Sequence, residues 1–291
     1  MTNTSEKITY TNANGDMIIF SFSPPFVLLG KSGFAGISND IVSEKIYGQA
    51  GELKNSSQLA VRELEIDAMI YGQTLQDEND YRRSLIKAIN PLLTGTLRYE
   101  LFGKTYAIDV EVVQGWESDY QQSSHTAQGS VKFKALYPLW RDISEENYTV
   151  QLGQTNNQLT FPLMITDDFI FASVDVGKEV QITNGGDIPI GFELTIDCTA
   201  EVVNPKLLNI YTQEFFAFNH TFSGGDNIFI NTNRGKKQVL VNGENGFFLR
   251  KLGSTFLQID NLENNYFILQ ADKGVENMVA SLKYHPQLVG V

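Results

Sequence analysis

The segment RELEIDAMI, residues 62–70, carries the pattern that decides the fold. Its apolar residues, from Leu64 to Ile70 at every second position, alternate with mostly acidic ones. This two-residue period is typical of a β-strand with one face in the core and one in water. Leu59 and Val61, just upstream, fall on the opposite phase of the alternation, so we expect a β-bulge between them and the strand.

A second stretch of alternation lies downstream of this strand. Apolar residues alternate over 97–101 and again over 106–112, on either side of Gly103-Lys104. The pattern predicts a β-hairpin with a glycine-first turn.

The segment between these strands has the period of a helix. Its apolar stripe is followed by Asn90-Pro91, which ends helices, and preceded by Asp77 and Asn79 as candidate caps. We therefore expect one helix near 79–89. The apolar stripe consists of Tyr81, Leu85, Ile86 and Ile89.

The composition changes after Trp140, where a polar and acidic stretch replaces the strand pattern. At 291 residues the chain exceeds the usual size of one domain, so we expect two: residues 1–145 and 158–291, joined by a linker at 146–157. Asn-Gly and Gly-Gly turn signals punctuate the second half and favour a β-sandwich or jelly roll there. The fold class is mainly β, with a first β-sandwich domain that carries the helix and a long hairpin.

Charge and composition exclude several classes of partner. The formal net charge of −12 opposes attachment to nucleic acid phosphates or anionic lipid. Cys198 is the only cysteine, so the chain forms no internal disulfide. Residues 1–10 lack the apolar run of a signal peptide, and no segment has the length of a membrane span. We expect synthesis in a bacterial host cytoplasm and no membrane insertion.

The residue types that catalysis needs are present, but not in a pattern that assigns them a role. Gly30-Lys31-Ser32 resembles the end of a phosphate-binding loop, yet Pro25 stands where its first glycine belongs. The three histidines lack metal-ligand spacing, and no nucleophile elbow occurs. Asp77-Glu78 and Asp167-Asp168 are typical of caps and solvated turns. We predict no catalytic residue, no metal site, no cofactor and no enzyme activity.

Saccharide binding is a separate alternative, because exposed aromatic rings stack on sugars. The spacing of the aromatic residues in the second half is more typical of core strands than of a stacking surface. These residues are Tyr211, Phe215, Phe216, Phe218 and Phe222.

Several short motifs, taken in order, resemble those of siphophage distal tail proteins of the Dit type. In the first half they are Tyr47–Leu53, Arg62-Glu63-Leu64, Tyr81–Leu85, Asn90–Leu97, Gly103–Tyr106, Gly115–Glu117 and Tyr137–Trp140. In the second half they are Asn184–Pro189, Asn204-Pro205, Gly225-Asp226, Ile230–Thr232, Asn242-Gly243 and Tyr284–Pro286. Each motif alone is weak, and their order makes the combination specific.

The resemblance implies a structural subunit of the virion tail tip, or baseplate, and a galectin-like C-terminal domain. It also implies a hexameric ring that joins the tail tube to the host-adsorption apparatus. The implied partners are the major tail tube protein, the tape measure protein and a tail-associated fibre or lysin-type protein, with a receptor-binding protein as a further partner. The alternative function is an adsorption module that binds host-wall saccharide through the C-terminal domain.

A ring needs a head-to-tail interface between unlike patches. The segment from Ile41 to Ile70 has the pattern of a long hairpin with a polar tip at 48–57. We predict that this hairpin is the arm that reaches a neighbouring subunit. The candidate arm residues are Tyr47, Gly48, Gln49, Gly51, Leu53 and Asn55.

Overall fold

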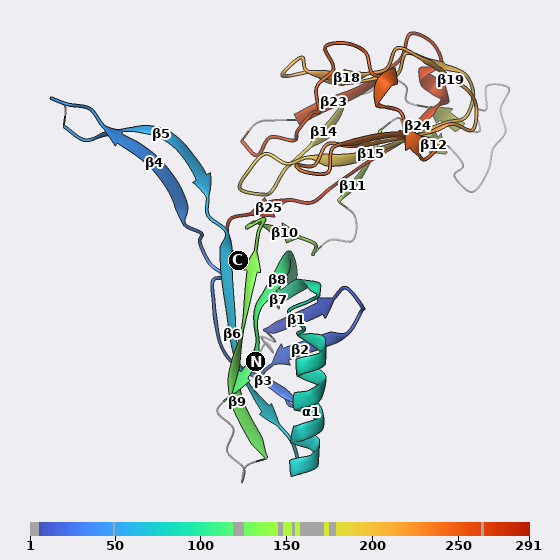
Figure 1. The fold of residues 1–291 in the computed structure, drawn as a ribbon. Helices are drawn as coiled ribbons and strands as arrows, with labels where there is room; N and C mark the ends of the chain where they lie inside the picture. The colour runs from blue at the N-terminus through green and yellow to red at the C-terminus, as the bar shows by residue number, and fades with distance from the viewer. Residues whose placement is uncertain are drawn as a thin grey trace. The chain divides into compact units, whose positions relative to one another are not determined.

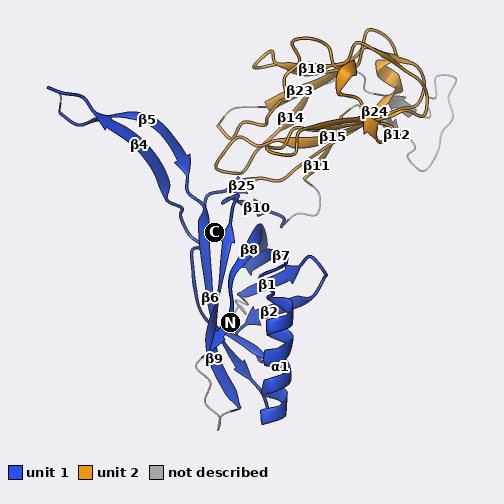
Figure 2. Cartoon of the chain, viewed as in Figure 1, with its two compact units in different colours: residues 1–144, 287–291 blue, residues 145–286 orange. Residues whose placement is uncertain are grey.

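The computed structural model describes residues 6–48, 50–118, 125–144, 148–152, 155–157, 172–174, 179–262 and 265–291. The chain forms two compact units, residues 1–144 with 287–291 and residues 145–286 (Figure 2). The predicted domain bounds of 1–145 and 158–291 stay a prediction about folding domains. The compact units differ from them in the last five residues, which pack with unit 1.

Unit 1 is built around a β-barrel of seven strands, each hydrogen-bonded to the next around the ring (Figure 1). In ring order these are β1 (Lys7–Asn12), β2 (Met17–Ser21), β3 (Phe26–Ser32), β6 (Arg62–Tyr71), β9 (Thr126–Ala135), β8 (Lys104–Ser118) and β7 (Thr94–Leu101). The alternation at 62–70 is confirmed, since the residues of β6 are buried and exposed in turn. The predicted hairpin is confirmed, but its turn consists of Phe102-Gly103, both at positive φ, so glycine is the second turn residue and not the first as expected.

The closed barrel differs from the β-sandwich that we expected. Strand β8 is 15 residues long and pairs with β7 over its first half, and then with β9 from Glu111 to Ser118. Two register shifts in the second half, between Val112 and Glu117, let the strand bend from one neighbour toward the other. One strand thus joins both ends of the sheet, which removes its free edges.

The core of unit 1 lies inside the barrel and under helix α1 (Leu75–Ala88). The helix begins four residues before the predicted start, because Thr74 and Asp77 form a capping box. Tyr81 packs edge-on against Phe26 of β3, and Asn12 of β1 donates a hydrogen bond to the carbonyl oxygen of Ala88. The helix therefore contacts strands on both sides of β2, which meets β3 in a single residue pair.

The remaining strands of unit 1 are a separate hairpin and a short edge pair. The hairpin consists of β4 (Asn39–Lys45) and β5 (Glu52–Leu59), and it extends away from the barrel (Figure 1). The expected bulge near Leu59 is a strand boundary instead, because β5 ends there and β6 begins at Arg62. The edge pair is β10 (Trp140–Asp142), which pairs with β8 and with β25 (Gln287–Leu288).

Unit 2 consists of antiparallel sheets around a second core. The six-stranded sheet contains β11 (Thr149–Leu152), β24 (Met278–Tyr284), β15 (Phe192–Cys198), β20 (Asn227–Asn231), β21 (Gln238–Val241) and β22 (Glu244–Asn245). The four-stranded sheet contains β14 (Val180–Ile182), β23 (Asn265–Gln270), β17 (Lys206–Asn209) and β18 (Phe215–Ala217). Phe192 and Phe267 meet with ring centroids 5.8 Å apart, so the inner faces of the two sheets contact each other.

Smaller elements complete unit 2. They are the pairs β12 (Thr155–Asn157) with β13 (Ala172–Val174) and β16 (Val202–Val203) with β19 (Thr221–Phe222), and two 3₁₀ helices, η1 (Phe247–Leu249) and η2 (Val275–Asn277). The fold is thus mainly β, and α1 is the one α-helix in the described part of the chain. None of the described helices has the length and apolar composition of a membrane span.

Candidate functional site

The β4–β5 hairpin is the most exposed element of unit 1. Every described residue of both strands is exposed, and neither strand pairs with a third strand among the described residues. Ile41, Val42 and Leu53 are 58%, 57% and 52% exposed. Ile41 and Val42 are neighbours in an extended strand, so their side chains lie on opposite faces. The hairpin therefore presents apolar groups on both faces.

The predicted arm residues occupy the tip and one irregular position of this hairpin. Tyr47 is fully exposed at the tip, where Gly48 and Gly51 have φ of +83° and +90°. The register shifts between Val42 and Ser43, so Asn55 is the extra residue of a bulge. Leu53 pairs with Glu44. Gln49 lies outside the described residues.

The base of the hairpin is fixed by Arg62, the first residue of β6. This side chain is only 2% exposed and donates hydrogen bonds to four backbone carbonyls. The acceptors belong to Gly33 and Ala35 upstream of β4, to Pro138 before β10, and to Val289 after β25. Burial lowers the pKa of Arg62, yet a guanidinium stays protonated in proteins. Three segments that are distant in sequence are thus held by one buried cation.

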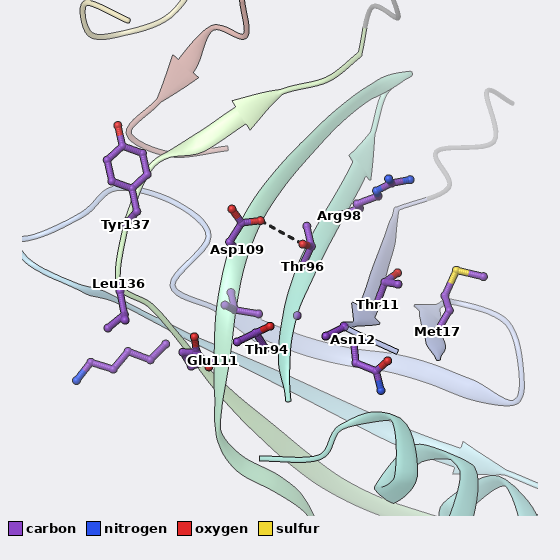
Figure 3. Close-up of a pocket in the computed structure, with 14 residues that line it drawn as sticks. Thr11, Asn12, Met17, Thr94, Thr96, Arg98, Asp109, Glu111, Leu136 and Tyr137 are labelled. Atoms are coloured by element: carbon purple, nitrogen blue, oxygen red, sulfur yellow. Dashed lines mark hydrogen bonds between the residues drawn. The ribbon is translucent and has the colours of Figure 1, made fainter. Parts of the chain in front are cut away.

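A groove of about 670 Å³ crosses the outer surface of the barrel over β1, β7 and β8. Exposed Met17 stands at one end and Leu136 and Tyr137 at the other (Figure 3). The middle is polar, with Thr96 donating a hydrogen bond of 3.1 Å to Asp109. The groove therefore combines apolar ends with a hydrogen-bonding centre.

Asp109 also forms an ion pair with Arg141 at this groove. Both Nη atoms of Arg141 lie 2.6 and 2.7 Å from its carboxylate oxygens. This hydrogen-bonded pair raises the pKa of Arg141 above its ordinary value. The Asp109 carboxylate thus accepts hydrogen bonds from both Thr96 and Arg141.

The described residues that were considered for catalysis stabilise the fold instead. Lys31 is in strand β3, where its Nζ contacts Glu6 and the Tyr99 hydroxyl, and no helix follows it as a phosphate loop requires. Asp77 caps α1, and Glu78 is buried 3.7 Å from Nε of Arg82. Asp167-Asp168 lies outside the described residues.

Cys198 and the residue types that bind metals also give no sign of a reactive or metal-binding site among the described residues. Burial, with smaller contributions from Asp226 and Asp197, raises the pKa of Cys198 to about 11, so its thiol stays neutral near pH 7. Within the described ranges, no three His, Cys, Asp or Glu side chains gather as a metal ligand set.

The aromatic residues considered for sugar stacking divide between core and surface. Phe216, Phe218 and Phe222 are buried in the core of unit 2. Phe215 is half-buried on the outer side of β18, the strand that contains Phe216. Tyr211 is exposed in the turn between β17 and β18. Their clustering in sequence therefore reflects mainly core packing.

Comparison with known protein families decides the identity of both halves. Residues 14–135 match the model of the phage tail protein RIFT-related domain, and residues 185–287 match the C-terminal domain of the siphovirus-type tail component. The chain belongs to the siphovirus Dit family of distal tail proteins. It is a structural phage tail protein.

Solved structures share this fold at low sequence identity. The Dit protein (gp 19.1) of phage SPP1, described as a paradigm of the hub adsorption apparatus in phages that infect Gram-positive hosts, is 12% identical, with a TM-score of 0.67 over 96% of this chain and 98% of that one. A chain of the phage P2 baseplate in its activated conformation with Ca is 11% identical, with a TM-score of 0.51 over 99% of both chains. No curated protein matches the sequence.

Proposed function

We propose that six copies of this protein form a ring at the tail tip and join the tail tube to the adsorption apparatus. The observation that supports this role is the β4–β5 hairpin, whose described residues are all exposed although several are large and apolar. We assign ring formation to the N-terminal domain, residues 1–145, and place the galectin-like domain, residues 158–291, on the adsorption side.

The hairpin has the properties of an arm that is buried only on assembly. An isolated two-stranded hairpin is marginally stable in water, and exposed strand edges invite pairing with another chain. Six apolar side chains lie on it: Ile41, Val42, Ile46, Tyr47, Leu53 and Leu59. Since each is at least 39% exposed, burial on a neighbour would contribute about 1 kcal/mol per side chain. Contact with a second subunit therefore stabilises the arm as well as the ring.

A ring also needs a second, different patch that accepts the arm. The barrel groove between Met17 and Leu136 suits this role, because its apolar ends fit apolar side chains of the hairpin and its polar centre fits serine and asparagine. In this proposal each subunit offers one arm and one groove, so that every copy is held by two neighbours.

The test is the mass of the full chain in solution, by light scattering or native mass spectrometry. Deleting residues 48–57 and, separately, the substitution Leu53→Glu should convert hexamers to folded monomers. The matched control is Leu262→Glu, which places the same charge on an exposed leucine outside the arm. A hexamer that survives the deletion would exclude the hairpin as the arm.

The proposed partners follow from the ring position. They are the tail tube protein, the tape measure protein, a tail-associated fibre or lysin-type protein and a receptor-binding protein. Co-purification of each with the wild-type chain, and loss of the tube protein from the monomeric deletion variant, would support the hub role.

A further inference from the structure

The four-stranded sheet of unit 2 has an outer face that its core does not use. Leu207, Phe216, Phe267 and Leu269 point inward and belong to the hydrophobic core. Because side chains alternate across a strand, the residues between them face outward. These outward residues come from β17, β18 and β23.

Three rows cross this face: the first lies just beyond the ends of β17 and β23, and strand register arranges the other two. In the first row, Asn204 donates a hydrogen bond of 2.7 Å to the Asp272 carboxylate. In the second row, Lys206 lies between Ala217 and Gln270 as their cross-strand partner. The third row is apolar, and consists of Phe215, Leu208 and Ile268. The face thus changes from hydrogen-bonding through cationic to apolar along the strands.

A groove of about 430 Å³ lies over the first and second rows and over Ile268 of the third, within the size range of small-molecule sites. Ala217 lies between two lysines: Lys206 pairs with it across the strand, and the backbone N–H of Lys251 donates 2.8 Å to its carbonyl oxygen. The small Ala217 side chain leaves room between the two lysine stems. The groove lining includes Asn204, Lys206, Lys251, Ile268, Gln270 and Asp272.

The charges of this groove contrast with those of the unit. Residues 145–286 carry nine Lys and Arg against 17 Asp and Glu, a net charge of −8. Yet among the described residues neither Lys206 nor Lys251 has a carboxylate within salt-bridge distance. Lys206 Nζ lies 5.0 Å from the centre of the Phe215 ring. Two cations without a carboxylate partner therefore share one groove in an acidic unit, where an anion would be the complementary ligand.

We propose that this groove binds an anionic saccharide, a sugar that carries a phosphate or carboxylate. The anionic group binds between Lys206 and Lys251, and the sugar hydroxyls bind the Asp272 carboxylate and the Asn204 and Gln270 amides. The apolar face of the sugar ring packs on Ile268, the residue of the third row that lines the groove. A free anion would leave the first and third rows unused, and a neutral sugar would leave the two cations unpaired.

This proposal is independent of the ring, because the groove lies within one unit and none of its residues belongs to the arm. Calorimetric titration of the full-length chain with glucose 1-phosphate, glucuronic acid, glucose, inorganic phosphate and an acidic peptide tests it. We expect both charged sugars to bind more tightly than glucose and inorganic phosphate, and binding to weaken as salt rises.

Variants locate the site. Lys206→Gln and Lys251→Gln should each weaken binding of the charged sugars about tenfold, the effect of one charge-assisted hydrogen bond. Lys236→Gln, on the exposed turn after β20, is the control and should bind as wild type. Lys251 is exposed, so its variant remains informative even where Lys206→Gln lowers stability.

Three results would overturn the proposal. Equal binding of glucose would exclude the role of the cations, and equal binding of inorganic phosphate would reduce the groove to a simple anion site. Binding of the acidic peptide alone, or of no probe at millimolar concentration, would exclude a saccharide ligand. As a control, each lysine variant should keep the oligomeric mass of the wild type, so that a change in affinity reflects ligand binding and not assembly.

Discussion

Replacing Arg62 by alanine should destabilise unit 1 more than any exposed charge substitution. The change removes the donors of four carbonyls, at N···O distances of 2.5 to 2.8 Å. Each of these charge-assisted hydrogen bonds contributes about 1 kcal/mol, so the expected loss is about 4 kcal/mol. At about 2 to 4 °C per kcal/mol for a unit of this size, the unfolding temperature should fall by roughly 8 to 16 °C.

Calorimetric unfolding of the full chain measures this loss, with the transition of unit 2 as an internal reference. Amide exchange gives a local readout, because the Val291 N–H donates to the Phe34 carbonyl oxygen close to the Arg62 network and should lose protection. Arg141→Ala is the matched control: it breaks a bidentate pair with Asp109, which is 55% exposed, and should cost at most about 1 kcal/mol. Equal shifts for the two variants, with Val291 protection unchanged, would refute the role of Arg62.

Two further predictions concern glycines of unit 1 and the cysteine of unit 2. Gly33→Ala should cost more than about 3 kcal/mol, because φ is +80° and the new Cβ would lie 1.9 Å from the Glu63 carbonyl oxygen. Gly15→Ala, at φ +87° with open space around it, should cost only about 1 kcal/mol, and similar denaturation midpoints for the pair would contradict this account. Burial raises the pKa of Cys198 from 9.0 to about 11, so the folded protein holds this proton more tightly than the unfolded chain does. The resulting stability is fully present below pH 9 and is progressively lost as the pH rises to about 11. This loss amounts to roughly 2 to 3 kcal/mol of unfolding free energy, and Cys198→Ala should abolish it. Urea unfolding at pH values from about 8 to 11 measures the effect, and a variant whose stability falls with pH as steeply as that of the wild type would exclude the role of Cys198.

Local patterns in the sequence predicted the strands and the helix, but not the way in which the sheet closes. The alternation at 62–70 and the hairpin around Gly103 depend on neighbouring residues, and both are confirmed. The barrel depends on β8 leaving β7 for β9, a pairing that no local period contains. A sandwich was therefore the natural expectation from periodicity alone.

Arg62 and the unit 2 groove show why the sites were harder to predict. A charged residue at the start of a strand has the pattern of an exposed one, and its burial depends on carbonyls contributed by distant segments. Lys206 and Lys251 are far apart in sequence and meet only through the register around Ala217. The aromatic cluster near them was the visible signal, yet most of it lies in the core.

The pairing of β10 with β25 has a consequence for how this protein can change. Trp140 lies opposite Leu288 and Arg141 opposite Gln287, so the chain leaves and re-enters the barrel unit on adjacent strands, roughly 5 Å apart. Residues 145–286 are therefore an insertion between β10 and β25, two paired strands of unit 1. A different domain whose termini lie close together could replace residues 145–286 without altering the order of any barrel strand. Exchange at this position offers a route by which the same barrel unit acquires new surface specificities.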